Sequence, residues 1–292
     1  MAFKSKWWEK WLARAFHVLL TSGVVTVVFI KETDLRKSIE SDKPVYAACF
    51  LSLLSAATIC YFLASLIDPG YVSTKSSNVN IEDGLICQGK EIASAVQSVD
   101  SNDEKDEETE TTRMMLAEGN ALKLRHCGYC EILQPLRSKH CEECGHCIRK
   151  YDHHCPWLAT CIGEKNHRFF WAFLLLETAV VCWVINIVWN AFKSKSTSNE
   201  WLKANWLLLC VMIFVVLILI VVGLLFACHS YMMLTAQTTW EFMSRSRISY
   251  LKYFPDDENP FDQGYFKNSM VFLCYCKPRT WEKLIKEKIH WR

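Results

Sequence analysis

Four long apolar runs limit what this chain of 292 residues can fold into. Each run is long enough to cross the hydrocarbon core of a bilayer, about 30 Å thick, as a helix. The runs extend over residues 11–30, 45–67, 169–192 and 206–230. The first could also be a signal peptide, but charged residues follow it instead of a small-residue cleavage site. The sequence therefore predicts an α-helical integral membrane protein with four transmembrane helices.

Lysine and arginine are distributed unevenly around these runs. They are more frequent in the C-terminal segment and in the loop between the second and third runs than in the short loops at 31–44 and 193–205. Because basic segments tend to stay on the cytosolic side, we expect both termini and the long loop in the cytosol. The net charge of +2 gives no indication of nucleic-acid binding.

The long loop carries a dense cluster of cysteines and histidines between Cys127 and Cys161. Cysteines separated by two residues are typical of zinc ligands at tight turns. A disulfide framework would need an oxidising compartment, and a RING-type module would need a further Cys-x2-Cys pair downstream. Two tetrahedral zinc ions need eight ligands, and the cluster supplies eight while leaving Cys155 over. Spacing does not decide which ligands share an ion.

Cys155 directly follows Asp152, His153 and His154. An unligated cysteine beside a histidine and an aspartate has the components of an activated nucleophile, because the imidazole can take the thiol proton. The local sequence leaves His153 and His154 nearly interchangeable as base and metal ligand. In the alternative, both histidines bind zinc and Cys155 is structural, which requires a different set of eight ligands.

The cluster also forms a recognisable pattern. It reads Cys127-x2-Cys130-x4-Pro135-x-Arg137-x2-His140-Cys141-x2-Cys144-x2-Cys147-x4-Asp152-His153-His154-Cys155-Pro156-Trp157, followed by Cys161-Ile162-Gly163-x2-Asn166-x3-Phe170. This segment resembles the cysteine-rich domain of the DHHC protein S-acyltransferases, or palmitoyltransferases. Three further motifs resemble those of the same family: Asp68-Pro69-Gly70, Thr238-Thr239-Trp240-Glu241 and Asn259-Pro260-Phe261.

The resemblance implies a ping-pong acyl transfer at the cytosolic membrane face. A long-chain acyl group would pass from palmitoyl-CoA to Cys155 and then to membrane-proximal cysteines of substrate proteins. The implied catalytic residues are Cys155, His153 and Asp152. The residues implied to bind the acyl-CoA are Arg125, Lys139 and Trp157. The implied ligands of two structural Zn²⁺ ions are Cys127, Cys130, His140, Cys147, Cys141, Cys144, His154 and Cys161.

Other polar residues carry weaker expectations. Gln134 stands where the family usually has a basic residue, so we expect a weaker phosphate contact there. The resemblance implies that Thr239 and Asn268 support the active site through hydrogen bonds. Glu177 and Asn186 lie in the third apolar run, and we expect both to face the interior of the helix bundle, where polar groups find partners.

These interpretations divide the chain into five segments. They are residues 1–67, the N-terminus and first two helices; 68–122, the Asp-Pro-Gly motif and a disordered acidic linker; 123–168, the zinc-binding catalytic domain with β-hairpins; 169–230, the last two helices; and 231–292, the cytosolic C-terminal segment. The family implies a Golgi or endoplasmic reticulum membrane, and an oligomer stays possible. Cys274 and Cys276 are either acylated or packed.

Two other classes of function remain open. A catalytically silent zinc scaffold in the membrane would keep the eight ligands but would not need Cys155. A transporter would need ionisable residues that converge in mid-membrane from several spans, and only Glu177 meets that description. The sequence Asp152-His153-His154-Cys155 favours the acyltransferase.

Overall fold

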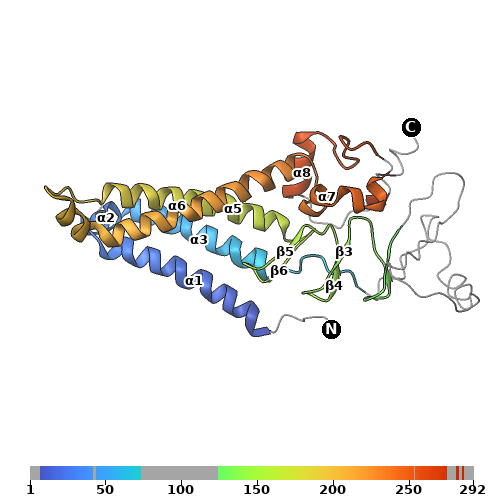
Figure 1. Ribbon diagram of the computed structural model, residues 1–292, viewed down its shortest axis with the longest axis horizontal. Coiled ribbons are helices and arrows are strands. Elements are labelled where there is room, and N and C mark those ends of the chain that lie inside the picture. The colour runs from blue at the N-terminus through green and yellow to red at the C-terminus, as the bar shows by residue number, and fades with distance from the viewer. Residues whose placement is uncertain are drawn as a thin grey trace, which may run out of the picture.

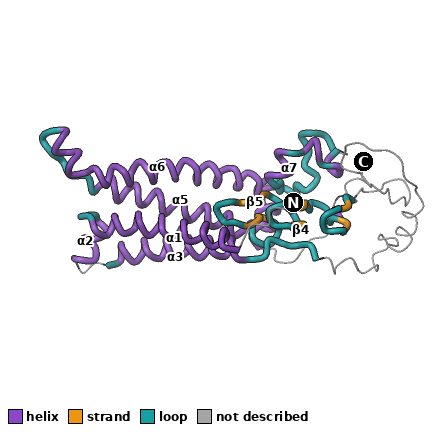
Figure 2. The backbone as a smooth tube through the Cα atoms, turned by 60° about the horizontal axis from the view of Figure 1, so that its bottom comes forward, coloured by secondary structure: helices purple, strands orange, loops and turns teal. Residues whose placement is uncertain are grey.

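The computed structural model describes residues 7–41, 44–73, 124–252, 254–274, 281–282 and 285. Four long helices lie side by side along the longest axis of the molecule (Figures 1 and 2). They are α1 (Trp7–Ile30), α3 (Val45–Leu66), α5 (His167–Asn190) and α6 (Ser198–Leu234). The predicted acidic linker lies, from residue 74 onward, outside the described residues, as does Cys276.

All four helices are long and apolar enough to cross a membrane, which confirms the predicted class. The largest difference from the prediction is α6, which has 37 residues and a length of about 55 Å. Hydropathy marked only its lipid-crossing part. Its polar first turn belongs to the helix because the Thr197 side chain caps it, accepting a hydrogen bond from the Glu200 amide at 3.3 Å.

The helices pack through a core of apolar side chains that includes Phe50, Ile187 and Leu208. A short helix, α2 (Asp34–Glu40), follows α1 and covers one end of the bundle, where its Leu35 is buried in the same core. The indole N–H of Trp183 donates to the Tyr46 hydroxyl at 2.8 Å and joins α5 to α3. Without a hydrophobic force between helices in lipid, such packing and hydrogen bonds are what hold the spans together.

The expectation for Asn186 is wrong. Its side chain is exposed and accepts a hydrogen bond from Asn190 on the same helix at 3.4 Å. Asn186 lies one turn from the end of α5, where a polar group can reach the headgroup region and needs no partner in the bundle. Glu177, deeper in the same helix, is half-buried.

Three short antiparallel hairpins lie at the end of the bundle opposite α2 (Figure 1). The strands are β1 (His126–Cys127), β2 (Ile132–Leu133), β3 (Lys139–Cys141), β4 (His146–Ile148), β5 (His153–Cys155) and β6 (Thr160–Ile162). In the last two hairpins His140 pairs with Cys147 and His154 pairs with Cys161. The predicted β-hairpins are therefore present, and strand register places candidate metal ligands opposite one another.

The Asp68-Pro69-Gly70 motif joins the hairpins to the end of α3. The Gly70 carbonyl accepts the Arg149 amide at 2.9 Å, and the Pro69 carbonyl accepts the Lys165 amide at 3.3 Å. Gly163 approaches the same Pro69 oxygen so closely that an added Cβ would lie 2.6 Å from it. These contacts fix the hairpins against the C-terminal end of α3.

The C-terminal segment wraps back over the hairpins. It contains α7 (Thr239–Met243), two 3-10 turns at Arg245–Arg247 and Ser249–Leu251, and α8 (Tyr265–Cys274). A second apolar core joins it to the loop after β2, with Leu136, Ile248, Phe261 and Trp281 among the buried side chains. The hairpins are thus held between the membrane helices and this segment.

Candidate active site

The eight predicted metal ligands fall into two groups of four. The first is Cys127, Cys130, His140 and Cys147, and the second is Cys141, Cys144, His154 and Cys161. Within each group the ligating atoms all lie within 4.8 Å of one another. The spacing had left this division open. It arises because β3 contributes adjacent residues, His140 and Cys141, whose side chains point to opposite faces of the strand.

The separations within the second group fit a zinc ion. Tetrahedral Zn–S and Zn–N bonds imply sulfur–nitrogen separations of about 3.5 Å. The Nδ1 atom of His154 lies 3.6 Å from Sγ of Cys141, 3.4 Å from that of Cys144 and 3.5 Å from that of Cys161. In the first group the Nδ1 atom of His140 lies 3.3 Å from Sγ of Cys130 and 4.0 Å from that of Cys147. The donor set of three thiols and one imidazole suits structural zinc.

Cys155 belongs to neither group among the described residues. It ends β5, one residue after the candidate ligand His154, and its pairing partner in β6 is Thr160. Successive side chains of a strand point to opposite faces. The pleat therefore turns His154 toward the metal group and Cys155 away from it, beside His153 and Asp152.

His153 lies between the thiol and a carboxylate. Its Nδ1 atom is 2.7 Å from Oδ2 of Asp152, and its side chain also interacts with that of Cys155. Burial alone would lower the pKa of His153, but the hydrogen bond to Asp152 and the interaction with Cys155 outweigh it and raise the pKa to about 9. The raised pKa makes this imidazole a stronger base and favours transfer of the thiol proton to it.

Asp152 is completely buried and is held from two sides. While Oδ2 faces His153, Oδ1 accepts the Thr239 amide at 2.9 Å. Burial alone would raise the pKa of Asp152, but the electrostatic effect of the nearby His167 and the hydrogen bond to His153 hold it well below its usual range. Thr239 therefore contacts the carboxylate through its backbone, at the start of α7.

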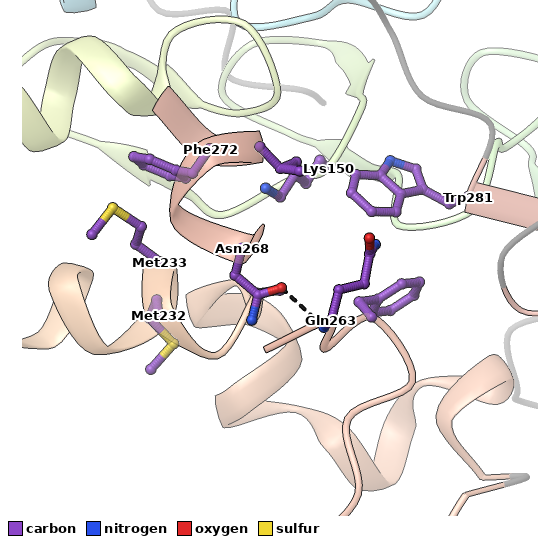
Figure 3. Close-up of a pocket in the computed structure, with 10 residues that line it drawn as sticks. Lys150, Met232, Met233, Gln263, Asn268, Phe272 and Trp281 are labelled. Atoms are coloured by element: carbon purple, nitrogen blue, oxygen red, sulfur yellow. Dashed lines mark hydrogen bonds between the residues drawn. The ribbon is translucent and has the colours of Figure 1, made fainter. Parts of the chain in front are cut away.

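Asn268 has a different place from the one expected. Its amide group donates to the Leu234 carbonyl and to Asp262, each at 2.6 Å, and its oxygen accepts the Gln263 amide at 3.0 Å. The bond to Leu234 ties the start of α8 to the end of α6, and Figure 3 shows the bond to Gln263. Among the described contacts, none joins Asn268 to Asp152, so it supports the C-terminal segment instead of the candidate triad.

An apolar layer surrounds the thiol. Cys155 is 7% exposed and clusters with Tyr61 of α3, Leu158, and Phe170 and Phe173 of α5. These side chains continue into the membrane part of the bundle. A hydrocarbon chain attached to Cys155 would meet apolar surface here and not water, which suits a lipid substrate.

The three residues predicted to bind the cofactor lie on different elements. Lys139 in β3 places its ammonium group 3.2 Å from the ring centroid of Trp240. Burial lowers the pKa of Lys139, and the nearby charge of Arg125 contributes in the same direction. Trp157 follows the triad, is 38% exposed, and packs edge to face against Phe16 of α1 at 5.7 Å. Lys139 and Arg125 thus form a positive region near α7.

Gln134 is buried and does not extend this positive region. Its Nε2 atom donates to Sγ of Cys147 at 3.3 Å. Groups that hydrogen-bond a metal ligand orient it and tune its charge. The expected weak phosphate contact is therefore replaced by a contact to a candidate zinc ligand.

A small cavity lies under α8, beside the site (Figure 3). Lys150 reaches into it, and its ammonium group lies 5.6 Å from the ring centroids of both Phe272 and Trp281. Burial and the charge of Arg137 lower the pKa of Lys150 to about 8. Met232 and Met233 form the α6 side of the cavity.

Sequence reasoning missed two features near Asp152. Arg137 forms a buried ion pair with Glu241, and His167 and His229 meet behind the carboxylate. A signal for the histidines was available, because His167 precedes the third apolar run and His229 ends the fourth. Ionisable residues at such places are uncommon in membrane helices and usually face a polar interior.

The sequence of this chain also matches those of known proteins. The family model described as DHHC palmitoyltransferase matches residues 121–246. The chain is 42% identical to palmitoyltransferase ZDHHC12-A of Danio rerio over 94% of its length and 93% of the relative's. It is 35% identical to palmitoyltransferase ZDHHC12 of Homo sapiens over 95% and 92%, and 30% identical to protein S-acyltransferase 10 of Arabidopsis thaliana over 85% and 76%.

Proposed function

The chain belongs to the DHHC palmitoyltransferase family and is a protein S-palmitoyltransferase, and we propose that Cys155 carries the acyl group between its two substrates. The observation that supports this role is the separation of Cys155 from both metal-ligand groups together with the interaction of its side chain with His153. A thiol without a metal and beside a base is available as a nucleophile.

In the first half-reaction His153 takes the proton of Cys155. The thiolate attacks the carbonyl carbon of palmitoyl-CoA, and the bond between that carbon and the CoA sulfur breaks. The proton on His153 goes to the leaving sulfur, so free CoA departs and the acyl group stays on Cys155 as a thioester. Asp152 keeps the imidazole oriented and stabilises it while it is protonated.

In the second half-reaction a substrate cysteine replaces CoA. His153 takes the proton of that thiol, the new thiolate attacks the acyl carbon, and Cys155 leaves and regains a proton. One thioester is exchanged for another in each step, so neither half-reaction needs a further energy source. The substrates implied are proteins with cysteines close to the membrane surface.

The two metal-ligand groups fit structural Zn²⁺. Bound zinc would crosslink the hairpins and would take no part in the acyl transfer. His154 and Cys161 of the second group flank Cys155 on the β5–β6 hairpin. This group therefore fixes the backbone on both sides of the nucleophile.

We place the acyl-CoA across the membrane boundary. Its hydrocarbon chain would lie against the apolar layer beside Cys155, and its phosphates near Arg125 and Lys139. Burying about fourteen methylenes at about 0.8 kcal/mol each favours presentation of the chain within the bilayer. Trp157, between Cys155 and α1, would contact the donor where the chain enters.

The distribution of basic residues supports a cytosolic position for both termini and the hairpins. A cytosolic position also keeps the thiols reduced. The family favours residence in the Golgi or endoplasmic reticulum membrane. The exposed apolar faces of the membrane helices are compatible with formation of a dimer.

Incubation of the purified protein with labelled palmitoyl-CoA tests the nucleophile. The wild type should take up label that hydroxylamine releases, as a thioester requires, and Cys155→Ser should take up none. Cys182→Ser is the matched control, because Cys182 is an exposed cysteine of α5 and should label normally. Undiminished labelling of Cys155→Ser would exclude Cys155 as the acyl carrier.

A further inference from the structure

We propose that His167 and His229 are positioning residues that hold Asp152 in place for the acyl transfer. This inference rests on the proposed function of Cys155, His153 and Asp152. The two histidines come from different membrane helices, since His167 is the first residue of α5 and His229 lies near the end of α6. Both helices thereby contribute to the support of one carboxylate.

The histidines form a continuous polar chain that ends at Asp152. Nε2 of His167 lies 3.2 Å from Nδ1 of His229, within hydrogen-bonding distance. Nδ1 of His167 faces Oδ1 of Asp152 at 3.9 Å. His167 is 3% exposed and His229 5% exposed, so the chain is shielded from solvent.

The surroundings leave Asp152 as the partner for His167. Nδ1 of His167 is buried and has no hydrogen-bond partner. Aromatic rings pack against the pair, with Phe272 5.0 Å from His167 and Phe170 5.0 Å from His229, centroid to centroid. In such an apolar layer an unpaired polar atom is costly, and a small movement toward Oδ1 satisfies it.

One arrangement of protons satisfies the whole chain. If Nδ1 of His229 donates to Nε2 of His167, the remaining N–H of His167 lies on Nδ1 and points at Asp152. The carboxylate then has three N–H neighbours, from His153, Thr239 and His167. A carboxylate held from several sides cannot rotate away when His153 becomes protonated, so the orientation of the base is kept.

Amide substitutions separate this role from a merely structural one. The side-chain amide of asparagine can occupy the position of Nδ1 of a histidine, and that of glutamine the position of Nε2. His167→Asn therefore keeps a donor toward Asp152 and loses the link to His229. His167→Gln keeps the link between α5 and α6 and loses the donor toward Asp152.

The measurement is the single-turnover rate of Cys155 acylation at saturating labelled palmitoyl-CoA, together with the palmitoyl-CoA concentration that gives half the maximal rate. His167→Gln should slow acylation about 10- to 100-fold, because the base loses its orientation, with little change in the half-saturating concentration. His167→Asn should stay within a few-fold of wild type. His229→Leu should fall between them, and His229→Asn should restore most of the loss.

The opposite order would overturn the proposal. If His167→Asn is slow and His167→Gln is normal, the pair only joins the two helices. Measurement of zinc per chain gives a second check, because Asp152, His167 and His229 are close enough to hold an ion. A third zinc that is lost in His229→Leu would make the group a metal site and would also overturn the proposal. The Cys155→Ser experiment does not depend on either result.

Discussion

Arg137 donates to both carboxylate oxygens of Glu241, at 2.6 and 2.5 Å, with its side chain completely buried. Arg137 belongs to the loop between the first two hairpins and Glu241 to α7. The guanidinium also lies 3.9 Å from the Phe261 ring centroid and 4.5 Å from that of Trp281. This pair fixes α7 on the hairpins, and α7 supplies the Thr239 amide to Asp152.

Arg137→Met should destabilise the protein strongly. Removing one partner of a buried ion pair leaves an uncompensated charge and costs about 3–5 kcal/mol. Arg137→Lys should be only partly tolerated, because an ammonium group can neither bond both oxygens in a fork nor stack as a plane. The midpoint of thermal denaturation in detergent checks this, with Arg36→Met as the control at the exposed Arg36–Glu40 pair. Equal midpoints for the two Met variants would contradict the assigned role.

The chemistry of the candidate site could be predicted from the sequence because its residues are close together in the chain. Asp152, His153 and Cys155 share one hairpin with two metal ligands, so spacing alone brings them near one another. The contacts of Asp152 with Thr239, and of Arg137 with Glu241, join residues about a hundred positions apart. Such contacts depend on how the C-terminal segment folds back, which periodicity does not encode.

Gln134→Leu should weaken zinc binding at the first metal-ligand group only. The substitution removes the N–H that Gln134 donates to Cys147 while it keeps a buried side chain of similar size. Loss of such a bond to a metal ligand typically lowers affinity about 10- to 100-fold. When a colorimetric chelator takes up the zinc, we expect two phases of release, one for each metal-ligand group. Only one of them should be faster in Gln134→Leu than in the wild type. Leu133→Ala, at an exposed neighbouring position, should leave both phases unchanged, and a uniform change in both phases would contradict the assignment.

Removal of zinc should stop acylation even though Cys155 is not a candidate ligand. Loss of zinc from the second group should impair acylation more than loss from the first, because His154 and Cys161 lie on the hairpin that carries Cys155. We therefore expect Cys161→Ser to abolish labelling, and Cys130→Ser to retain a measurable fraction at low temperature. Labelling with palmitoyl-CoA and zinc content per chain are measured on the same samples. Full labelling of Cys161→Ser without its zinc would show that the hairpin does not need the ion.

The number and positions of the membrane helices could be predicted from the sequence, but their ends could not. Hydropathy located four spans, since lipid requires long apolar helices. It missed the polar first turns of α6, which begin at Ser198, because they lie beyond the hydrocarbon core. Asn186 lies in an apolar run, but its place near the headgroup end of α5 lets it face outward. Which way a side chain of α5 points depends on how α3 and α6 pack against this helix.

Tyr61→Phe should slow acylation without unfolding the bundle. The Tyr61 hydroxyl donates to the Trp157 carbonyl at 3.2 Å, and Ser65, one turn later in α3, donates to the Leu158 carbonyl at 3.0 Å. These two bonds attach the loop after Cys155 to the membrane helix. Loss of one neutral hydrogen bond costs about 1 kcal/mol of stability, but the freed loop changes where the thiol points.

The matched control is Tyr46→Phe, because the Tyr46 hydroxyl also bonds across helices, to Trp183, in a part of the bundle remote from the hairpins. Both variants should lower the denaturation midpoint by a similar small amount, since each removes one partly buried hydroxyl bond. Only Tyr61→Phe should lower the single-turnover acylation rate, by about 5- to 10-fold if the loop shifts by a fraction of an ångström. Equal rates for the two variants would mean that the loop is held without Tyr61. In that case Ser65 and the guanidinium of Arg14, which donates to Ser65 Oγ at 2.7 Å, suffice to hold it.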